Sequence, residues 1–373
     1  MIASSGRVKI LIADDSAVMR SLLRTVVTSD AGLEVAGTAA NGEAALGAIE
    51  TLRPDLVLLD VEMPVMDGLA TLRRLRALGH RMPVIMCSSL TQRGAKVTIE
   101  ALASGASDYV AKPAGQAGRE AAMQTLTQDL IPKIQALTSR PQLAHPGVVR
   151  IPLLAPVATF SPQPISSVTT ALVIGVSTGG PAALDVLLPS LPANFPLPVL
   201  IVQHMPELFT KLFAERLNDR CALQVHEAVD GESVRAGLMY IAKGNWHMEV
   251  VPSTRIGLPP TLHLSQGRPE NHCRPAADVL FRSAAAVYGA GVLAVVLTGM
   301  GTDGMLGARV IREHGGSVLV QDQASSAVWG MPGAVAHAGL AHKVLPLNAI
   351  AAEIIRLTSR AQTETRESRK SVA

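Results

Sequence analysis

Aromatic residues are scarce in this 373-residue chain, at 3%, although hydrophobic residues as a whole make up 48%. The cores must therefore be built mainly from Ala, Val, Leu, Ile and Met, and so much apolar sequence excludes an intrinsically disordered chain. At roughly 100–200 residues per domain, the length predicts two domains. Charge is nearly balanced, with 33 basic and 30 acidic residues, so nothing indicates a nucleic-acid partner.

Cysteine is also rare. Cys87, Cys221 and Cys273 are irregularly spaced and form no CxxC pair, which argues against a disulfide framework or a zinc cage and predicts a reducing, cytoplasmic location. The N-terminus reaches charged residues too soon for a secretory signal. An uncharged run at 283–302 is about long enough to span a bilayer. Its glycines and the β-rich segment Val292–Leu297 favour a helix end, a turn and a buried strand, so we expect no membrane insertion.

Short β-rich runs alternate with amphipathic helical patterns from residue 8 to about residue 137. The expected strands are Val8–Ala13, Leu33–Thr38, Leu56–Asp60, Val84–Cys87 and Tyr109–Ala111. The expected helices begin near Ser16, Asn41, Leu69, Thr91 and Arg119. This alternation predicts a parallel sheet covered by helices on both faces, with the C-terminal ends of its strands along one edge.

The composition changes abruptly after this region. Residues 141 to 164 contain one charged residue and six prolines, at positions 141, 146, 152, 156, 162 and 164. Because proline lacks an amide donor and fixes φ, residues 138–166 are expected to form an extended linker between a domain at 1–137 and a domain at 167–358. The polar tail at 359–373 is expected to be disordered.

A second α/β pattern begins at Ala171. Its expected strands are Ala171–Gly175, Val199–Gln203, Val292–Leu297 and Ser317–Gln321. A β-rich insert around Met239–Val251 and Thr261–Ser265 interrupts them, with Gly244-Asn245 as a candidate hairpin turn. The fold class expected for this half is therefore a doubly wound, mostly parallel α/β domain with a β-rich insert.

Polar and charged side chains follow the strands of the first domain. Asp14 and Asp15 follow its first strand, Asp60 ends the third, and Ser88 and Lys112 follow the fourth and fifth. Clustered carboxylates repel one another unless a cation lies among them, and Mg²⁺ prefers such oxygen ligands. One carboxylate could then attack a phosphoryl group, with Lys112 and Ser88 contacting its oxygens. Taken alone, the Asp-Ser pair after the first strand could instead be a helix N-cap.

The segments LIADDS, LLDVEMPVMDGL, PVIMCSS and DYVAKP together resemble the receiver domain of bacterial two-component response regulators. The resemblance covers about 130 residues and implies a flavodoxin-like fold with a histidine kinase as phosphodonor. It implies Asp60 as the phosphoacceptor and Mg²⁺ held by Asp15 and Asp60 with Asp14 nearby. It also implies switch and phosphate contacts at Ser88, Tyr109 and Lys112.

The first strand of the second domain leads into a glycine-rich turn with the sequence GVSTGGP, which contains Ser177. The turn lacks both the GxGxxG pattern of dinucleotide-binding sites and the lysine of a P-loop. Its Gly-x-Ser-x-Gly pattern matches a nucleophile elbow, in which a sharp strand-to-helix turn exposes the serine hydroxyl. An ordinary glycine-rich turn between a strand and a helix is the alternative.

A nucleophilic serine needs a base and an acid that orients the base. His204 follows the expected strand Val199–Gln203, and Asp303 lies in the glycine-rich segment after Val292–Leu297, so both should lie beside Ser177. Peptide groups near Thr178 and Met300 are candidate oxyanion donors. The other histidines of this domain show no HxxxH or HExxH spacing, so we expect no metal or other cofactor in this site.

The segments VIGVSTGGPAAL, VLIVQHMP, YIAKGNWHM, HCRPAADVLFRSAA and VVLTGMGTDGMLGA resemble the catalytic domain of the chemotaxis protein-glutamate methylesterases, the CheB family. With the receiver in front, the resemblance spans both domains. It implies Ser177 as nucleophile, His204 as base and Asp303 as the residue that orients it. The implied substrates are glutamyl γ-methyl esters on the cytoplasmic domains of methyl-accepting chemoreceptors, with deamidation of certain receptor glutamines as a second activity.

The sequence therefore predicts a phosphorylation-activated serine esterase that acts in chemosensory adaptation. One alternative is a receiver-regulated esterase with a different ester substrate, because the carrier of the ester is implied by resemblance alone. A transcriptional response regulator is a second alternative, but it would need a helix-turn-helix or a basic output domain, and neither is visible in the sequence.

Overall fold

The structure, a computed structural model, describes residues 6–89, 91–113, 118–138, 169–253, 255 and 257–358. The chain divides into two compact units, Met1–Pro146 and Gly147–Ala373. Except for Thr138, the linker predicted at 138–166 lies outside the described residues, as does the tail predicted at 359–373.

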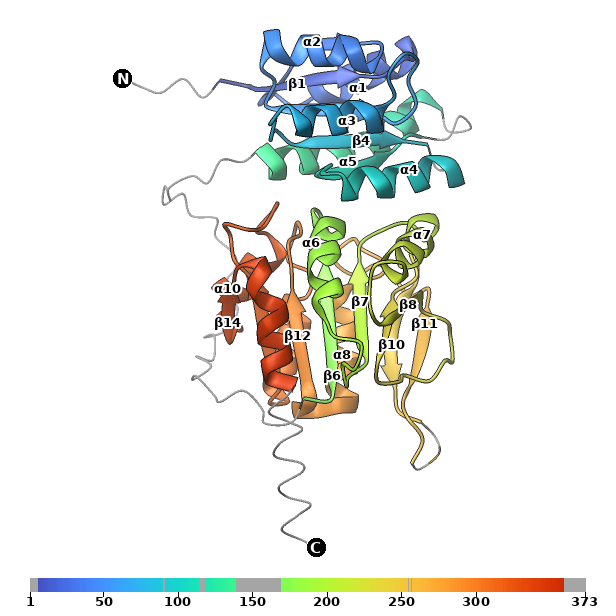
Figure 1. The fold of residues 1–373 in the computed structure, drawn as a ribbon, viewed down its shortest axis with the longest axis vertical. Coiled ribbons are helices and arrows are strands. Elements are labelled where there is room, and N and C mark those ends of the chain that lie inside the picture. The colour runs from blue at the N-terminus through green and yellow to red at the C-terminus, as the bar shows by residue number, and fades with distance from the viewer. Residues whose placement is uncertain are drawn as a thin grey trace, which may run out of the picture. The chain divides into compact units, whose positions relative to one another are not determined.

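The N-terminal unit contains a five-stranded, fully parallel sheet with the strand order β2-β1-β3-β4-β5 (Figure 1). The strands are β1 (Val8–Ala13), β2 (Leu33–Ala39), β3 (Leu56–Asp60), β4 (Val84–Ser88) and β5 (Asp108–Ala111). The helices are α1 (Ala17–Thr28), α2 (Gly42–Leu52), α3 (Gly68–Ala77), α4 (Gln92–Ala103) and α5 (Arg119–Thr138). This is the flavodoxin-like strand order, so the predicted fold is confirmed.

Local sequence signals explain where four of these helices begin. The residue before each helix accepts a hydrogen bond from a backbone N–H of the first turn through its side chain; these residues are Ser16, Asn41, Asp67 and Thr91. The strands β3 and β4 are buried along their whole length, as expected for central strands of a parallel sheet. The helices and strands therefore bring the polar strand ends to one edge.

The C-terminal unit contains a seven-stranded sheet with the order β14-β13-β12-β6-β7-β9-β8, in which every pairing is parallel. Its strands are β6 (Ala171–Val176), β7 (Val199–Gln203), β8 (Gln224–Glu227), β9 (Leu238–Ile241), β12 (Val292–Val296), β13 (Ser317–Gln321) and β14 (Lys343–Leu345). Its helices include α6 (Gly180–Leu187), α7 (Glu207–Asn218), α8 (Ala277–Tyr288), α9 (Met305–Glu313) and α10 (Met331–His337). The doubly wound α/β fold predicted for this half is confirmed.

The strand order reverses beside β6, because the chain first continues to β7 on one side and later returns to β12 on the other. Open α/β sheets bind ligands at such a point, outside the C-terminal ends of the strands. Loops after β6, β7 and β12 carry Ser177, His204 and Asp303, so the topology brings these three residues to the position where a site is expected.

The insert differs in part from the prediction. Residues Leu238–Ile241 join the main sheet as β9, and a separate two-stranded antiparallel sheet pairs β10 (His247–Val251) with β11 (Thr261–Ser265). The hairpin predicted at Gly244-Asn245 is therefore wrong. Gly244 instead lies against the start of α7, where a Cβ atom would be 2.2 Å from the backbone nitrogen of Glu207. The glycine permits a close approach of two backbones rather than a reversal between paired strands.

The uncharged run at 283–302 has the secondary structure that the sequence predicted. It contains the end of α8, a short 3-10 turn at Gly289–Gly291 and the buried strand β12. Within the described residues, no helix combines the length and the apolar character needed to cross a membrane. The edge strands β8 and β14 were not predicted, because each is only three or four residues long.

Candidate active site and phosphorylation site

Lys112 occupies the centre of the acidic pocket at the strand ends of the N-terminal unit. Its Nζ atom lies 2.8 Å from Asp14 Oδ2 and 2.7 Å from Asp60 Oδ1. Both carboxylates are buried, whereas Asp15 is exposed. Asp14 is held from a second side, because its Oδ1 accepts the backbone N–H of Ser16 at 2.9 Å. The structure thus brings together the three acidic residues and the lysine that the sequence predicted.

Burial and the ion pairs of Lys112 together shift the pKa values of the groups in this pocket. Burial raises the pKa of Asp60, and the charge of Asp14 adds to the rise, while the Lys112 ammonium and the Glu62 backbone N–H oppose it. Burial would lower the pKa of Lys112, but its two carboxylate partners outweigh burial and raise the pKa. Lys112 is therefore held in its charged form between two carboxylates that need a cation.

The same pocket fits a small divalent cation. Asp14, Asp15 and Asp60 each offer one carboxylate oxygen, and these oxygens lie within 4.8 Å of one another. Hard oxygen donors in such a cluster suit Mg²⁺, which keeps its remaining coordination positions for water and phosphate oxygens. The acidic pocket is therefore compatible with Mg²⁺ binding.

The other two receiver residues singled out by sequence, Ser88 and Tyr109, are buried like Asp14 and Asp60. Ser88 is buried, its Oγ accepts a hydrogen bond from Thr98 Oγ1 at 2.7 Å, and its carbonyl accepts the Lys112 N–H at 2.7 Å. Tyr109 is only 7% exposed, and Lys133 Nζ lies 5.2 Å from its ring centroid. Within the described residues, no hydrogen bond joins the side chain of Asp60 to that of Ser88 or Tyr109.

The second site is built where β6 ends. The backbone N–H of His204 donates to Val176 at 3.2 Å, and the N–H of Ser177 donates to Thr298 at 3.0 Å. Gln203 Nε2 donates to the Ser177 carbonyl at 3.1 Å. The turn that carries Ser177 is therefore fixed by the segments that follow β7 and β12, as a strand-to-helix nucleophile turn requires.

His204 and Asp303 form a direct pair. The imidazole Nε2 lies 2.8 Å from Asp303 Oδ2, and Asp303 is only 1% exposed. The same carboxylate accepts the backbone N–H groups of Ala277 at 2.6 Å, Asp278 at 3.0 Å and Gly304 at 3.0 Å. Asp303 thus binds the first two N–H groups of α8, a helix whose own preceding residue provides no capping side chain.

These contacts shift the pKa values of the pair in opposite directions. Burial would lower the pKa of His204, but its hydrogen bonds to Asp303 and Cys273 outweigh burial and raise it to about 10. Burial would raise the pKa of Asp303, but His204 and the backbone donors outweigh burial and hold it below the usual value. Asp303 is therefore a fixed anion beside a strongly basic imidazole.

With Nε2 paired to Asp303, the imidazole Nδ1 is the atom that remains for a proton from Ser177. No hydrogen bond of Ser177 Oγ occurs among the described contacts, and Nδ1 instead faces Cys273 Sγ at 3.6 Å. Sequence reasoning missed Cys273, Asn271 and Asp278, although all three lie in or next to a segment quoted for the family resemblance. Their part in the site depends on a loop conformation that the sequence pattern did not reveal.

The candidate oxyanion residues flank this pair. Thr178 is buried, and its carbonyl accepts a hydrogen bond from Thr298 Oγ1 at 2.9 Å. Met300 is partly exposed, and its backbone N–H donates no hydrogen bond within the described part of the chain. The Ser177 N–H is occupied by Thr298, so it is not available to an oxyanion.

Comparison with known proteins identifies the family of each unit. The CheB methylesterase family profile matches residues 172–354, and the response regulator receiver domain profile matches residues 10–124. A protein-glutamate methylesterase/protein-glutamine glutaminase from Nocardioides sp. is 50% identical over 95% of this chain and 96% of that protein. The chain belongs to the CheB methylesterase family. The family resemblance seen in the sequence is thereby confirmed.

A second full-length relative and a solved catalytic domain are also similar to this chain. A Trichodesmium erythraeum protein of the same name is 48% identical over 93% of this chain and 98% of that protein. The crystal structure of the Thermotoga maritima CheB methylesterase catalytic domain is 42% identical, with a TM-score of 0.49, and covers 51% of this chain and 98% of that one. The full-length relatives therefore match both units of this chain.

Proposed function

We propose that this CheB-family member is a phosphorylation-activated serine esterase that hydrolyses glutamyl γ-methyl esters on chemoreceptors and deamidates specific receptor glutamines. The observation that carries the proposal is the hydrogen bond between His204 and the buried Asp303 carboxylate, in loops at the switch point of the sheet where Ser177 also lies. The names of the full-length relatives, which specify both a glutamate methylesterase and a glutamine glutaminase, support the choice of substrate.

The arrangement supplies each step of ester hydrolysis. Ser177 Oγ attacks the ester carbonyl while His204 Nδ1 takes its proton, and the same proton then passes to methanol as the C–O bond breaks. Water, activated by His204, attacks the acyl-enzyme and releases the glutamate side chain and Ser177. Deamidation follows the same course with ammonia as the leaving group. Asp303 holds the imidazole and stabilises its protonated form.

The developing oxyanion needs hydrogen-bond donors near Ser177. We assign this role to peptide groups at Met300 and Thr178, which lie in the two loops that flank the serine. The unengaged N–H of Met300 supports this assignment.

In the receiver unit, Asp60 is the proposed phosphoacceptor. Its carboxylate attacks a phosphoryl group of a donor, and Lys112, which already contacts Asp60, pairs with the phosphoryl oxygens that arrive there. Mg²⁺ held by Asp14, Asp15 and Asp60 would supply the positive charge that offsets these oxygens. Ser88 and Tyr109 are the proposed residues through which the phosphorylated state is transmitted.

The partners follow from the two activities. We propose a chemosensory histidine kinase as phosphodonor, the cytoplasmic domains of methyl-accepting chemoreceptors as substrate, and a cytoplasmic location for the enzyme. The three free cysteines accord with a reducing compartment.

Incubation with methyl-labelled, receptor-rich membranes tests the substrate. We expect methanol release that rises on addition of a small phosphodonor. Hydrolysis of a small-ester panel without methanol release from receptors would instead support the alternative, a receiver-regulated esterase with another substrate.

A further inference from the structure

A second buried carboxylate lies beside Asp303 and has no part in the mechanism described above. Asp278 is fully buried in the first turn of α8, and its Oδ1 accepts the backbone N–H of Gly307 in α9 at 2.6 Å. Asp303, which lies just before α9, in turn accepts the first N–H groups of α8. Each helix N-terminus is therefore satisfied by a carboxylate from the neighbouring helix segment.

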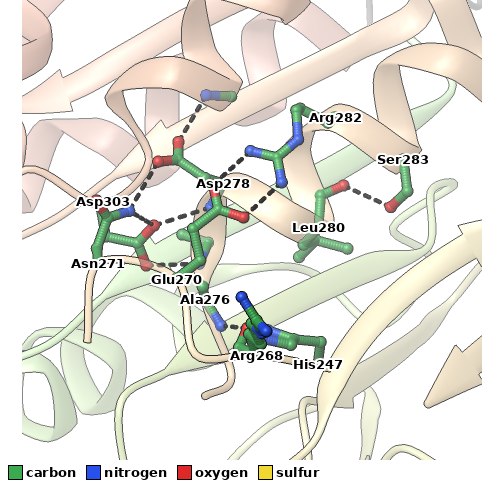
Figure 2. A network of polar contacts seen from close by, with 12 residues as sticks. His247, Arg268, Glu270, Asn271, Ala276, Asp278, Leu280, Arg282, Ser283 and Asp303 are labelled. Carbon is green, nitrogen blue, oxygen red and sulfur yellow. Dashed lines mark hydrogen bonds and ion pairs between the residues drawn. The ribbon is translucent and has the colours of Figure 1, made fainter. Parts of the chain in front are cut away.

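One amide group joins the two carboxylates. Asn271 Nδ2 donates to Asp278 Oδ2 at 2.9 Å and to Asp303 Oδ1 at 3.0 Å (Figure 2). Burial and the charge of Asp303 raise the pKa of Asp278 to about 6, so the two carboxylates oppose each other's ionisation. The Asn271 amide lies where it offsets this repulsion by donating to both.

The loop that carries Asn271 is held in an unusual conformation. Asn271 and His272 both have positive φ values, 51° and 62°, a region in which asparagine and histidine are enriched. Glu270 and Cys273 exchange two backbone hydrogen bonds across them, at 3.0 and 2.8 Å. Arg282 of α8 fixes the Glu270 carboxylate with two bonds of 2.6 Å (Figure 2). These contacts hold the loop so that the side-chain amide of Asn271 lies between Asp278 and Asp303.

We propose that Asn271 and Asp278 form a positioning pair for the esterase reaction. Asp278 fixes the orientation of the Asn271 amide. This amide in turn holds the Asp303 carboxylate in the orientation that accepts the hydrogen bond of His204. The proposal rests on the proposed function, because it concerns the base of that reaction. It predicts that Asp278, which contacts neither His204 nor Ser177 in the described structure, controls turnover.

Three variants separate positioning from stability. In Asp278→Asn, the new amide accepts the Gly307 N–H through its oxygen, so its nitrogen faces the Asn271 nitrogen and forces that amide to turn away from Asp303. In the double variant Asn271→Asp/Asp278→Asn, donor and acceptor are exchanged. The bond between positions 271 and 278 and the bond to Gly307 can both form again, but Asp303 then faces a carboxylate. The control Glu353→Gln weakens the ion pairs of Glu353 with Lys343 and Arg356, which involve neither this loop nor Asp303.

The measurements are kcat and KM for methanol release from methylated receptor membranes, together with the thermal midpoint of each full-length variant. We expect Asp278→Asn and the double variant to lose ~10- to 100-fold in kcat with little change in KM. The double variant should regain part of the thermal midpoint that Asp278→Asn loses, because two of the hydrogen bonds form again while Asp303 faces a carboxylate. Glu353→Gln should lower the midpoint while leaving kcat within about threefold of the wild type.

Recovery of kcat together with the thermal midpoint in the double variant would overturn the proposal, because the pair would then be merely structural. If the variants at 278 do not fold, Asn271→Gly removes the amide at a position where glycine tolerates the positive φ. A wild-type kcat in Asn271→Gly would also overturn the proposal. Ser177→Ala in the same assay tests the proposed function separately. If the wild type releases no more methanol than Ser177→Ala, the proposed function fails, and the positioning role fails with it.

Discussion

The two units of this chain place a buried aspartate at the same kind of sheet edge but compensate its charge in different ways. Asp60 contacts the Lys112 ammonium and receives one long backbone hydrogen bond, from Glu62 at 3.4 Å. Asp303 receives three backbone N–H groups, the Asn271 amide and the His204 ring. Burial raises the pKa of Asp60, whereas the donors around Asp303 lower its pKa.

This difference suits two different tasks. A carboxylate that must attack phosphorus needs an oxygen that is not fully engaged, and a cation that can move to the incoming oxygens. A carboxylate that must orient a base needs every oxygen held in place. The positions of these residues after parallel strands therefore bring them together at one edge of each sheet. The hydrogen-bond donors around each carboxylate then determine the chemistry that it suits.

The largest expected effect concerns the serine site. Ser177→Ala or His204→Ala should lower turnover on the order of 10⁴-fold or more, because the members of a triad act as a unit. Methanol release from methylated receptor membranes measures the loss, with circular dichroism as the check on folding. A folded Ser177→Ala protein within tenfold of the wild-type rate would remove the serine from the mechanism.

The receiver site should respond to a substitution that leaves the serine site untouched. With Mg²⁺ and a small phosphodonor, the wild type should gain one acid-stable, alkali-labile acyl phosphate, and Asp60→Asn should gain none, because an amide is a poor nucleophile toward phosphorus. Intact-mass spectra of both proteins measure this. Equal labelling of the two would contradict the assignment of Asp60.

The pH dependence of kcat/KM tests whether Asp303 raises the pKa of His204. His204 must be neutral to accept a proton, so a raised pKa moves the acidic limb of kcat/KM to a pH above 6.5, and activity should rise with pH through the alkaline range. Asp303→Asn removes the carboxylate and should move this limb to lower pH while reducing the maximal rate. A limb at the same pH in both proteins would show that Asp303 does not control the base.

Removal of divalent cations should give the smallest effect on the serine site. A chelator should abolish phosphorylation at Asp60 but change the basal rate of methanol release by less than about twofold, because the carboxylate cluster with metal-binding geometry in the described residues lies in the receiver unit. Parallel assays with and without added Mg²⁺ measure both quantities. A large loss of basal activity on chelation would place a metal requirement at the serine site.

Much of the fold was predictable because local signals agree with the topology. Capping side chains such as Ser16 and Asn41 begin helices where the apolar periodicity starts, and runs of consecutive apolar residues such as Leu56–Leu59 form central strands. The sequence predicted that Ser177, His204 and Asp303 lie together because each lies in the loop that follows a strand of one parallel sheet.

The rest depends on contacts between distant residues. The proposed role of Asn271 requires two consecutive positive φ values, in a loop whose Glu270 carboxylate binds Arg282, a residue on another element. The Gly244-Asn245 pair carries the same local signal as a hairpin turn, and only the packing of Gly244 against α7 shows its different purpose. A sequence pattern indicates which backbone conformations a residue tolerates. It does not indicate which distant residues pack against it.

The central claim is that the state of Asp60 governs the reaction at Ser177. The most direct test is the rate of methanol release from methylated receptor membranes by the wild type and by Asp60→Asn, each with and without a small phosphodonor. We predict that the phosphodonor accelerates the wild type and leaves Asp60→Asn unchanged. Equal rates for the wild type with and without the donor, under conditions where Asp60 is shown to be phosphorylated, would contradict the claim.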